Sequence, residues 1–198
     1  CRIVGNTAGT YGGGVFQNTG GGLLDHCLIW SNTAVSNQGG GVYCNAGATV
    51  RNCLIHHNAS REGGGVFINN GAVESCTIVT NRATALFGGG VMFWDGGSVS
   101  NSIVHANTAA LSDPNIRTRG IWRVDYTCTS PDPGGVGNTT EDPAFAAPGD
   151  YRLPWDSPCV DVGRSQAWMS GALDLDAYRR VAGAAPDMGA YESREVHY

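Results

Sequence analysis

The sequence has no lysine, few charged residues of either sign and no long apolar run. Its 12 basic residues are all arginines, and with 17 acidic residues they give a net charge of −5. A weakly acidic surface attracts neither nucleic acid nor an anionic membrane, so we expect neither as a partner. No apolar stretch approaches the roughly 18 residues that a membrane-spanning helix needs, so we expect no membrane span.

The first residues lack an initiator methionine and a signal peptide, and Cys1 opens the chain in the middle of a repeat. We interpret the chain as a processed piece of a longer precursor. Its first coil would expose apolar core and unpaired strand edges. Missing coils, another domain or a neighbouring copy must cover them, and the last case would be head-to-tail self-association through the uncapped N-terminal coil.

Glycine is abundant instead, with 30 residues, about twice the usual share. The glycines belong to a repeat, which is clearest when the chain is aligned on one asparagine: CRIVGN (1–6), CLIWSN (27–32), CLIHHN (53–58), CTIVTN (76–81) and SIVHAN (102–107). The steps are 26, 26, 23 and 26 residues, and GGGV recurs in phase at 12–15, 39–42, 63–66 and 88–91. Anchors that stay in phase over several steps indicate a repeat architecture.

The periodicity inside each unit predicts strands. C-x-I and V-F-I alternate with period two, and no helical stripe runs through residues 1–110. One unit is then one coil of a parallel β-solenoid, in which each strand pairs with its equivalent one coil away. We predict a right-handed parallel β-helix of about seven coils. Residues 1–110 form the regular coils of 23–26 residues, and residues 111–198 form irregular coils and loops that complete the same solenoid.

Identical residues at each step would stack into ladders along the solenoid. We expect the first cysteines of the units to be small buried apolar residues, because parallel Cβ directions suit a disulfide poorly. The asparagines should hydrogen-bond up their column and adopt left-handed turn geometry. The two ladders are Cys1, Cys27, Cys53 and Cys76, and Asn6, Asn32, Asn58, Asn81 and Asn107.

Two further cysteines lie outside the repeat in loop-rich sequence. They are Cys128 in YTCTSPDPGG and Cys159 in WDSPCVDVG. We predict a disulfide between them, which implies an oxidising, extracytoplasmic setting.

The C-terminal third resembles a known family. The series YTCTSPDPGGVGN, EDPAF, GDYRLPWDSPCVDVG, DLDAYRR and PDMGAYE is similar to the closing segment of bacterial right-handed β-helix surface proteins, the pectin-lyase-like repeat proteins of the choice-of-anchor Q type. The resemblance implies secretion or surface display, a β-helix with irregular final coils, and little chemistry. DLDAYRR lacks the Gly-Asn turn usual after DLD in these proteins, which weakens any idea of calcium at Asp174 and Asp176.

Outward residues of the strands are the place for a binding surface. Sugars stack on exposed aromatic rings, so Trp30 or the column of Phe16, Tyr43 and Phe67 could bind a glycan. His56 and His105 belong to the same outward column as Trp30. The alternative, which we favour, is that the outward apolar residues are covered by the C-terminal segment or by another chain, because long exposed apolar strips are unusual. Those residues are Leu28, Leu54 and Ile103.

The sequence offers weak candidates for catalysis and metal binding. Asp25 and Glu74 share an outward column, but Arg51 lies between them, so we expect a salt-bridge ladder that lowers both pKa values. His56 and His105 should be about 9–10 Å apart, too far for one metal ion, and His57 should point elsewhere. We therefore expect no catalytic residue, metal or cofactor.

Two functions remain. The first is an extracellular structural or interaction protein, either a rigid β-helical surface protein or a filament-forming subunit, without catalysis of its own. The second is a carbohydrate-active or glycan-binding β-helix, because polysaccharide lyases and glycoside hydrolases share the fold; fold alone does not establish chemistry.

Overall fold

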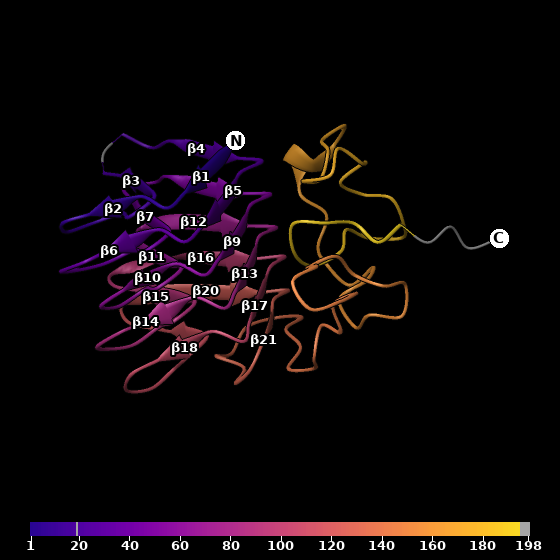
Figure 1. The fold of residues 1–198 in the computed structure, drawn as a ribbon. Helices are drawn as coiled ribbons and strands as arrows, with labels where there is room; N and C mark the ends of the chain where they lie inside the picture. Colours follow the sequence, from indigo (N-terminus) through magenta and orange to yellow (C-terminus); the bar gives the residue numbers. More distant parts are fainter. Residues whose placement is uncertain (19, 195–198) are drawn as a thin grey trace.

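The computed structural model describes residues 1–18 and 20–194, so residues 195–198 of the predicted C-terminal region lie outside it. Its strands are two to five residues long and stack into four parallel sheets (Figure 1). Sheet A has six strands and sheets B, C and D have five each, so the chain makes about five turns. The expectation of about seven coils was wrong, because residues 130–194 add no further strand to any sheet and only one isolated parallel bridge, between Cys128 and Thr139.

Each coil visits the sheets in the order A, B, C, D. Sheet A contains β1 (Arg2–Val4), β5 (Leu28–Trp30), β9 (Leu54–His56), β13 (Thr77–Val79), β17 (Ile103–His105) and β21 (Cys128–Thr129). Sheet B contains β2 (Thr7–Ala8), β6 (Thr33–Ala34), β10 (Ala59–Ser60), β14 (Arg82–Ala83) and β18 (Thr108–Ala109). Sheet C contains β3 (Val15–Gln17), β7 (Val42–Asn45), β11 (Val66–Asn69), β15 (Val91–Phe93) and β19 (Ile116–Arg117). Sheet D contains β4 (Leu23–Asp25), β8 (Thr49–Arg51), β12 (Gly71–Glu74), β16 (Gly96–Ser100) and β20 (Ile121–Asp125).

The core runs through the middle of the stack and is built from ladders. Ile3, Ile29, Ile55, Ile78 and Val104 are in register on sheet A, and Val15, Val42, Val66, Val91 and Ile116 on sheet C. Apart from Ile3 and Val15 in the first coil, all of them are buried. The alternation of the strands therefore places one side chain in the core and the next outside, as period two requires.

The asparagine ladder carries the turn from sheet A to sheet B. Each side-chain Oδ1 accepts the backbone N–H and the side-chain amide of the asparagine in the preceding coil; Asn58 Oδ1, for example, lies 2.9 and 3.0 Å from the two nitrogens of Asn32. The ladder continues beyond Asn107 to Asn115, which the repeat does not reveal. The left-handed residue is the one before each asparagine, such as His57 at φ 53°, and not the asparagine itself.

Cys27, Cys53 and Cys76 are buried hydrogen-bond donors as well as small core residues. Cys1 is exposed, so the expectation of a buried residue was wrong there, because its coil lies at the edge of the stack. Cys53 Sγ donates to the carbonyl of Arg51 at 3.0 Å, and Cys27 and Cys76 make the equivalent bond. In the next two coils a hydroxyl performs the same task, from Ser102 and then Thr127. The column thus selects a short side chain with a donor, since the carbonyl at the end of sheet D would otherwise lose a partner.

The GGGV corner needs glycine for two reasons. Gly39 has φ +71°, a conformation that residues with a Cβ rarely adopt. A Cβ on Gly40 would lie 2.4 Å from the carbonyl oxygen of Gly64 in the next coil. The close approach of successive coils at this corner therefore excludes any side chain.

The regular coils extend to Thr129, and the loop that follows closes that end of the stack. Trp122 turns inward on β20 and packs against the core. The backbone N–H of Tyr126 donates to the carbonyl of Val136 at 2.8 Å, so the loop satisfies part of the last edge.

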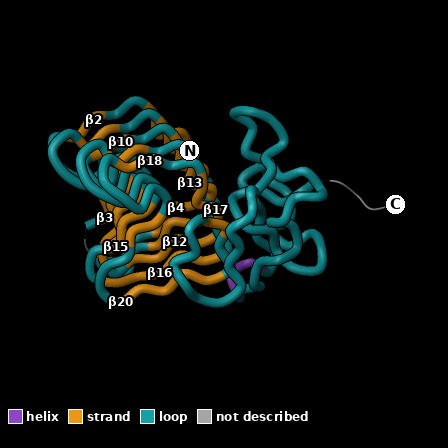
Figure 2. The backbone as a smooth tube through the Cα atoms, turned by 90° about the horizontal axis from the view of Figure 1, so that it is seen from below, coloured by secondary structure: helices purple, strands orange, loops and turns teal. Residues whose placement is uncertain are grey.

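Residues 130–194 then lie along the outer face of sheet A instead of lengthening the stack (Figures 1 and 2). We call these residues the cover. The cover is mostly loop, with one short 3₁₀ helix, η1 (Ala167–Met169). Its apolar residues form two clusters with outward side chains of sheet A: Leu54 and Val79 pack with Ala190 and Tyr191, and Ile103 packs with Leu153, Cys159 and Met188. The outward apolar column is therefore covered by the chain's own C-terminal segment.

Candidate functional site

The aromatic column on sheet C is a stack of rings. Phe16, Tyr43 and Phe67 are in register, and their ring centroids lie 5.1 and 5.2 Å apart. The planes of Tyr43 and Phe67 differ by 14°, and Phe67 is only 1% exposed. Since these two rings turn their faces to each other and Phe67 is buried, the column offers little flat surface for a sugar.

The exposed aromatic residues beside this column are also engaged. Tyr11 stacks on Phe16 at 5.8 Å. Trp94 has the guanidinium of Arg119 over its ring, 3.9 Å from the centroid. The glycan platform predicted for Phe16, Tyr43 and Phe67 therefore has no support from the ring geometry.

Trp30, His56 and His105 lie on the outward side of sheet A, at the margin of the cover. Trp30 and His56 stack with planes 10° apart, and Tyr151 of the cover contacts the imidazole of His56. The expectation that His57 points elsewhere was wrong: its Nδ1 lies 2.7 Å from Nδ1 of His56, because the left-handed turn at His57 brings the ring back. Burial, together with His57, lowers the pKa of His56 to about 4.

His105 is separated from His56 by the rung of Val79. It lines a shallow depression of about 480 Å³ with Tyr151 and Phe145 of the cover. The structure does not bring the two histidines together, and no group of three or more potential metal ligands occurs within residues 1–18 and 20–194.

The acidic column on sheet D is only partly a salt-bridge ladder. Arg51 pairs with Asp25 at 3.0 Å, and its guanidinium lies over the ring of Trp168 in the cover. Glu74, on the other side of Arg51, has no ion pair among the described residues. Burial raises the pKa of Glu74 and outweighs the attraction of Arg51, so the expected lowering was wrong for this residue.

Glu74 lines a groove of about 440 Å³ between sheet D and the cover, which we call the sheet D groove. Its floor comes from outward side chains of β12, β16 and β20, and its far wall comes from the cover. Its lining includes Glu74, Ser98, Ser100, Arg123, Asp125, Arg164 and Gln166.

The second carboxylate of the groove is Asp125. Register places it two rungs from Glu74, through Ser100, which is about 9–10 Å between the strands. Asp125 is 6% exposed; it pairs with Arg123 and accepts the backbone N–H of Val136 at 3.0 Å. The groove thus combines one paired carboxylate and one unpaired carboxyl group.

A family model described as "Right handed beta helix region" matches residues 1–109, more than half of the chain. The chain belongs to the right-handed β-helix family. The predicted right-handed parallel β-helix is therefore confirmed by the family match and by the parallel stack of coils. No curated protein and no solved structure matches the chain.

In this right-handed β-helix the described residues contain no helix that could cross a membrane, since η1 has three residues.

Cys128 and Cys159 of the β-helix lie together where the last coil meets the cover. Cys128 pairs in register with Ile103, so it stands in the outward column, and both cysteines belong to one buried cluster with Met188. The hydrogen bond that Cys159 shares with Cys128 and the burial of its thiol both raise the pKa of Cys159. All seven cysteines are thiols in the structure, so the disulfide is not formed there and stays a prediction.

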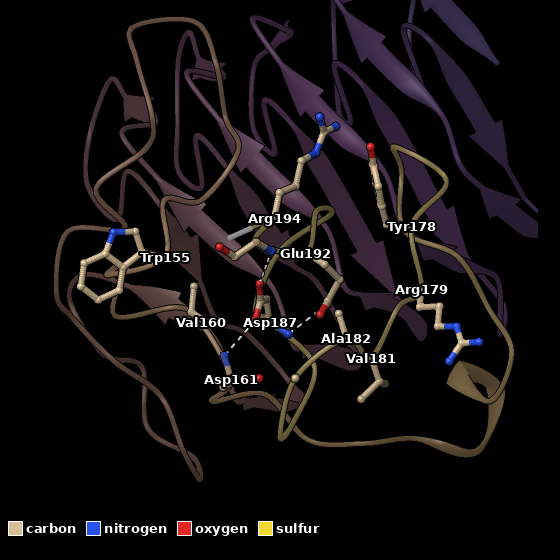
Figure 3. A pocket seen from close by; sticks show the side chains of 12 residues that line it. Trp155, Val160, Asp161, Tyr178, Arg179, Val181, Ala182, Asp187, Glu192 and Arg194 are labelled. Atoms are coloured by element: carbon tan, nitrogen blue, oxygen red, sulfur yellow. Dashed lines mark hydrogen bonds between the residues drawn. The ribbon is translucent and has the colours of Figure 1, made fainter. Parts of the chain in front are cut away.

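The cover also contains a pocket of about 550 Å³, shown in Figure 3. Behind it Arg180 is fully buried and pairs with Glu192 at 2.7 Å. Burial raises the pKa of Glu192 to about 8, although Arg180 opposes the shift. Asp187 on the same wall accepts the backbone N–H of Asp161 at 2.8 Å, so these charges hold the loops of the cover together.

The two aspartates of DLDAYRR also serve the cover. Asp174 is buried and accepts backbone N–H groups of Tyr178 and Glu192 at 2.8 Å. Asp176 pairs with Arg152 at 2.7 Å. The two carboxylates thus bind different protein partners.

Proposed function

We propose that this protein is a rigid β-helical scaffold with a structural or interaction role outside the cell, displayed on a surface or assembled into filaments. One observation supports the role above the others. The asparagine ladder joins each coil to the next through two hydrogen bonds per rung, from Asn6 to Asn107. Residues repeated for this purpose stiffen a rod and carry no chemistry of their own.

The extracellular location is supported by the resemblance of the C-terminal third to secreted β-helix surface proteins. The placement of Cys128 beside Cys159 is compatible with it, because a disulfide there would persist only in an oxidising compartment. Antibody labelling of intact source cells tests the location: labelling without permeabilisation is expected, and labelling only after permeabilisation contradicts it.

Self-association is the second part of the proposal. Strands β1 to β4 are each at one edge of their sheet, and such edges accept further parallel strands. A coil of a second copy, in register with β1 to β4, would continue every ladder at once. This contact is heterologous and repeats without closing, so it builds a filament.

Electron microscopy and sedimentation velocity on one sample of purified protein test the assembly. Fibres of regular width support self-association through the first coil. Discrete particles of 20.6 kDa would refute self-association. They would not by themselves refute the role as a surface scaffold, which the labelling experiment tests.

A further inference from the structure

We propose that His26 is a proton-dependent latch, which fastens the loop of residues 169–180 in the cover to the first coils of the β-helix. We call residues 169–180 the latch loop; it lies beside the first coils (Figure 1). The inference concerns regulation, so it goes beyond the scaffold role and does not depend on it. It rests on the position of one imidazole ring between two oxygen atoms that only accept hydrogen bonds.

The ring of His26, in the turn between β4 and β5, bridges the solenoid and the cover. Its Nδ1 lies 2.8 Å from Oδ1 of Asp25, and its Nε2 lies 2.9 Å from the carbonyl oxygen of Leu173. A carboxylate and a carbonyl oxygen only accept hydrogen bonds, whereas a neutral imidazole has a single N–H to donate. Only the imidazolium ion therefore satisfies both contacts at once.

A neutral His26 must give up one of the two contacts, and Asp25 decides which. The Asp25 carboxylate is adjacent in the sequence and is held in place by Arg51 at 3.0 Å and by the side-chain amide of Asn52 at 3.2 Å. A hydrogen bond to an ionised acceptor is stronger than one to a neutral carbonyl, so the remaining proton stays on Nδ1. The lone pair of Nε2 then faces the lone pairs of the Leu173 carbonyl. That contact is repulsive, and the link to the loop is lost.

The latch loop has its other hydrogen bonds within the cover. The backbone N–H of Asp174, for example, donates to the carbonyl of Tyr178 at 2.7 Å, and among the described residues the remaining hydrogen bonds of residues 171–174 also stay inside the cover. Leu173 is 43% exposed, so apolar burial holds this point weakly. Loss of the His26 contact therefore frees this part of the loop from the solenoid.

The charged groups around the latch single out Asp25 as the partner of the ring. These groups are the carboxylates of Asp25 and Asp174, the ammonium group of Cys1, and the guanidinium groups of Arg51 and Arg179. The Cys1 ammonium group donates to the backbone carbonyl of His26 at 2.9 Å, and Arg51 is bound to Asp25. The carboxylate of Asp174 accepts backbone N–H groups of the cover. Within the described residues, Asp25 is thus the charged group that contacts the imidazole nitrogens.

The latch closes as the pH falls. Its closed state holds one proton more than its open state, so acid favours closure. A rise through pH 5–8, the range in which histidine side chains change charge, favours opening. The response is opposite to that of His56, because acid opposes the burial of the neutral His56 ring against Tyr151. The two histidine contacts of the cover therefore respond to acid in opposite directions.

Amide hydrogen exchange, measured by NMR at pH 5.5 and 7.5 and corrected for the intrinsic exchange rates, tests the latch. The amides of Ala172 and Asp174 are hydrogen-bonded within the loop. They should be about tenfold better protected at pH 5.5, because one charge-assisted hydrogen bond then holds the loop closed. Long-range proton–nitrogen spectra should show both ring nitrogens of His26 protonated at pH 5.5 and mainly Nδ1 protonated at pH 7.5.

Two variants distinguish a latch from a histidine with a purely structural role. His26→Asn suits the left-handed backbone at φ 51° but lacks the two ring nitrogens, so protection should be low and equal at both pH values. In Asp25→Asn the new side-chain amide donates to Nδ1, and neutral His26 keeps its proton on Nε2 for Leu173. Protection should then be high at both pH values. His105→Gln, which alters a histidine outside the latch, is the matched control and should keep the tenfold difference.

Equal protection of the loop at both pH values in the unaltered protein overturns the latch. A pH difference that persists in His26→Asn also overturns it, since another group would then be responsible. The amide signals of the buried Ile55 and Ile78 show in each variant that the coils are folded. The scaffold role is decided separately, by microscopy, sedimentation and antibody labelling.

Discussion

Sheets A and C each present a column of mostly apolar side chains outward, yet the two columns are shielded from water in different ways. The column of sheet A, with Leu54 and Ile103, is buried beneath the cover. The column of sheet C, with Phe16 and Tyr43, does not lie beneath the cover, and its rings stack on each other. Aliphatic side chains cannot bury one another along a single row, so they require a second layer, whereas flat rings shield one another's faces.

The largest expected effect concerns the attachment of the cover to sheet A through Cys128 and Cys159, which has no counterpart on sheet C. Oxidation of Cys128 and Cys159 to a disulfide should stabilise the protein by about 3–4 kcal/mol, the usual value for a loop of this length. Thiol titration of the denatured, oxidised protein should find two thiols fewer than the sequence has cysteines, the same number as in Cys128→Ser/Cys159→Ser. The oxidised protein should also have a higher melting temperature than the reduced protein. Equal stability of oxidised and reduced protein would mean that the cover is held by packing alone.

The next prediction removes a residue beneath the cover. Ile103→Ala should lower the free energy of unfolding by about 2–4 kcal/mol, because the side chain is fully buried between β17 and the cover. Urea denaturation measures the change. A loss below about 1 kcal/mol would show that the cover rests loosely on sheet A.

Acid should loosen the margin of the cover. The pKa of His56 is lowered from 6.5 to about 4 by burial and by His57, so between these values the unfolded chain binds more protons than the folded one. The contribution of neutral His56 to the free energy of unfolding is fully present above pH 6.5, and it is lost as the pH falls from 6.5 through about 4. Melting temperatures measured across that window should fall less steeply for His56→Gln than for the unaltered protein; identical slopes would contradict the assignment.

The smallest effect is expected on sheet C. Phe16→Ala should lower the free energy of unfolding by about 1 kcal/mol, the value of one aromatic pair, because Phe16 is 47% exposed at the end of its column. The same denaturation experiment serves here. A loss as large as that of Ile103→Ala would show that sheet C depends on its outward column as strongly as sheet A does.

The repeat predicted most of the stack because each anchor occupies the same place in every coil. The inward isoleucines, the asparagine column and the outward order of Val4, Trp30, His56, Val79 and His105 all follow from register alone. The coil number did not follow, because residues 130–194 carry turn signals similar to those of a coil but no anchor in phase.

The sheet D groove could not be predicted from the sequence, for a different reason. Asp25, Arg51 and Glu74 stand in one column, and the sequence does not show which of the two carboxylates forms the ion pair with Arg51. Trp168, from a segment without repeats, lies against Arg51 and is part of the same cover that closes the groove. The sequence does not reveal Asp125, because its strand, β20, lies past residue 110, where the predicted regular coils end.

The cover has a consequence for the order in which the protein folds. Hydrogen bonds between coils join residues 23 to 29 positions apart, so each new coil can form on the last as the chain emerges. The cover instead joins distant partners: Ala190 donates to Thr77, and His26 bonds the carbonyl of Leu173. A chain that builds its rod one coil at a time must therefore leave the aliphatic face of that rod open to water until its last residues have been made.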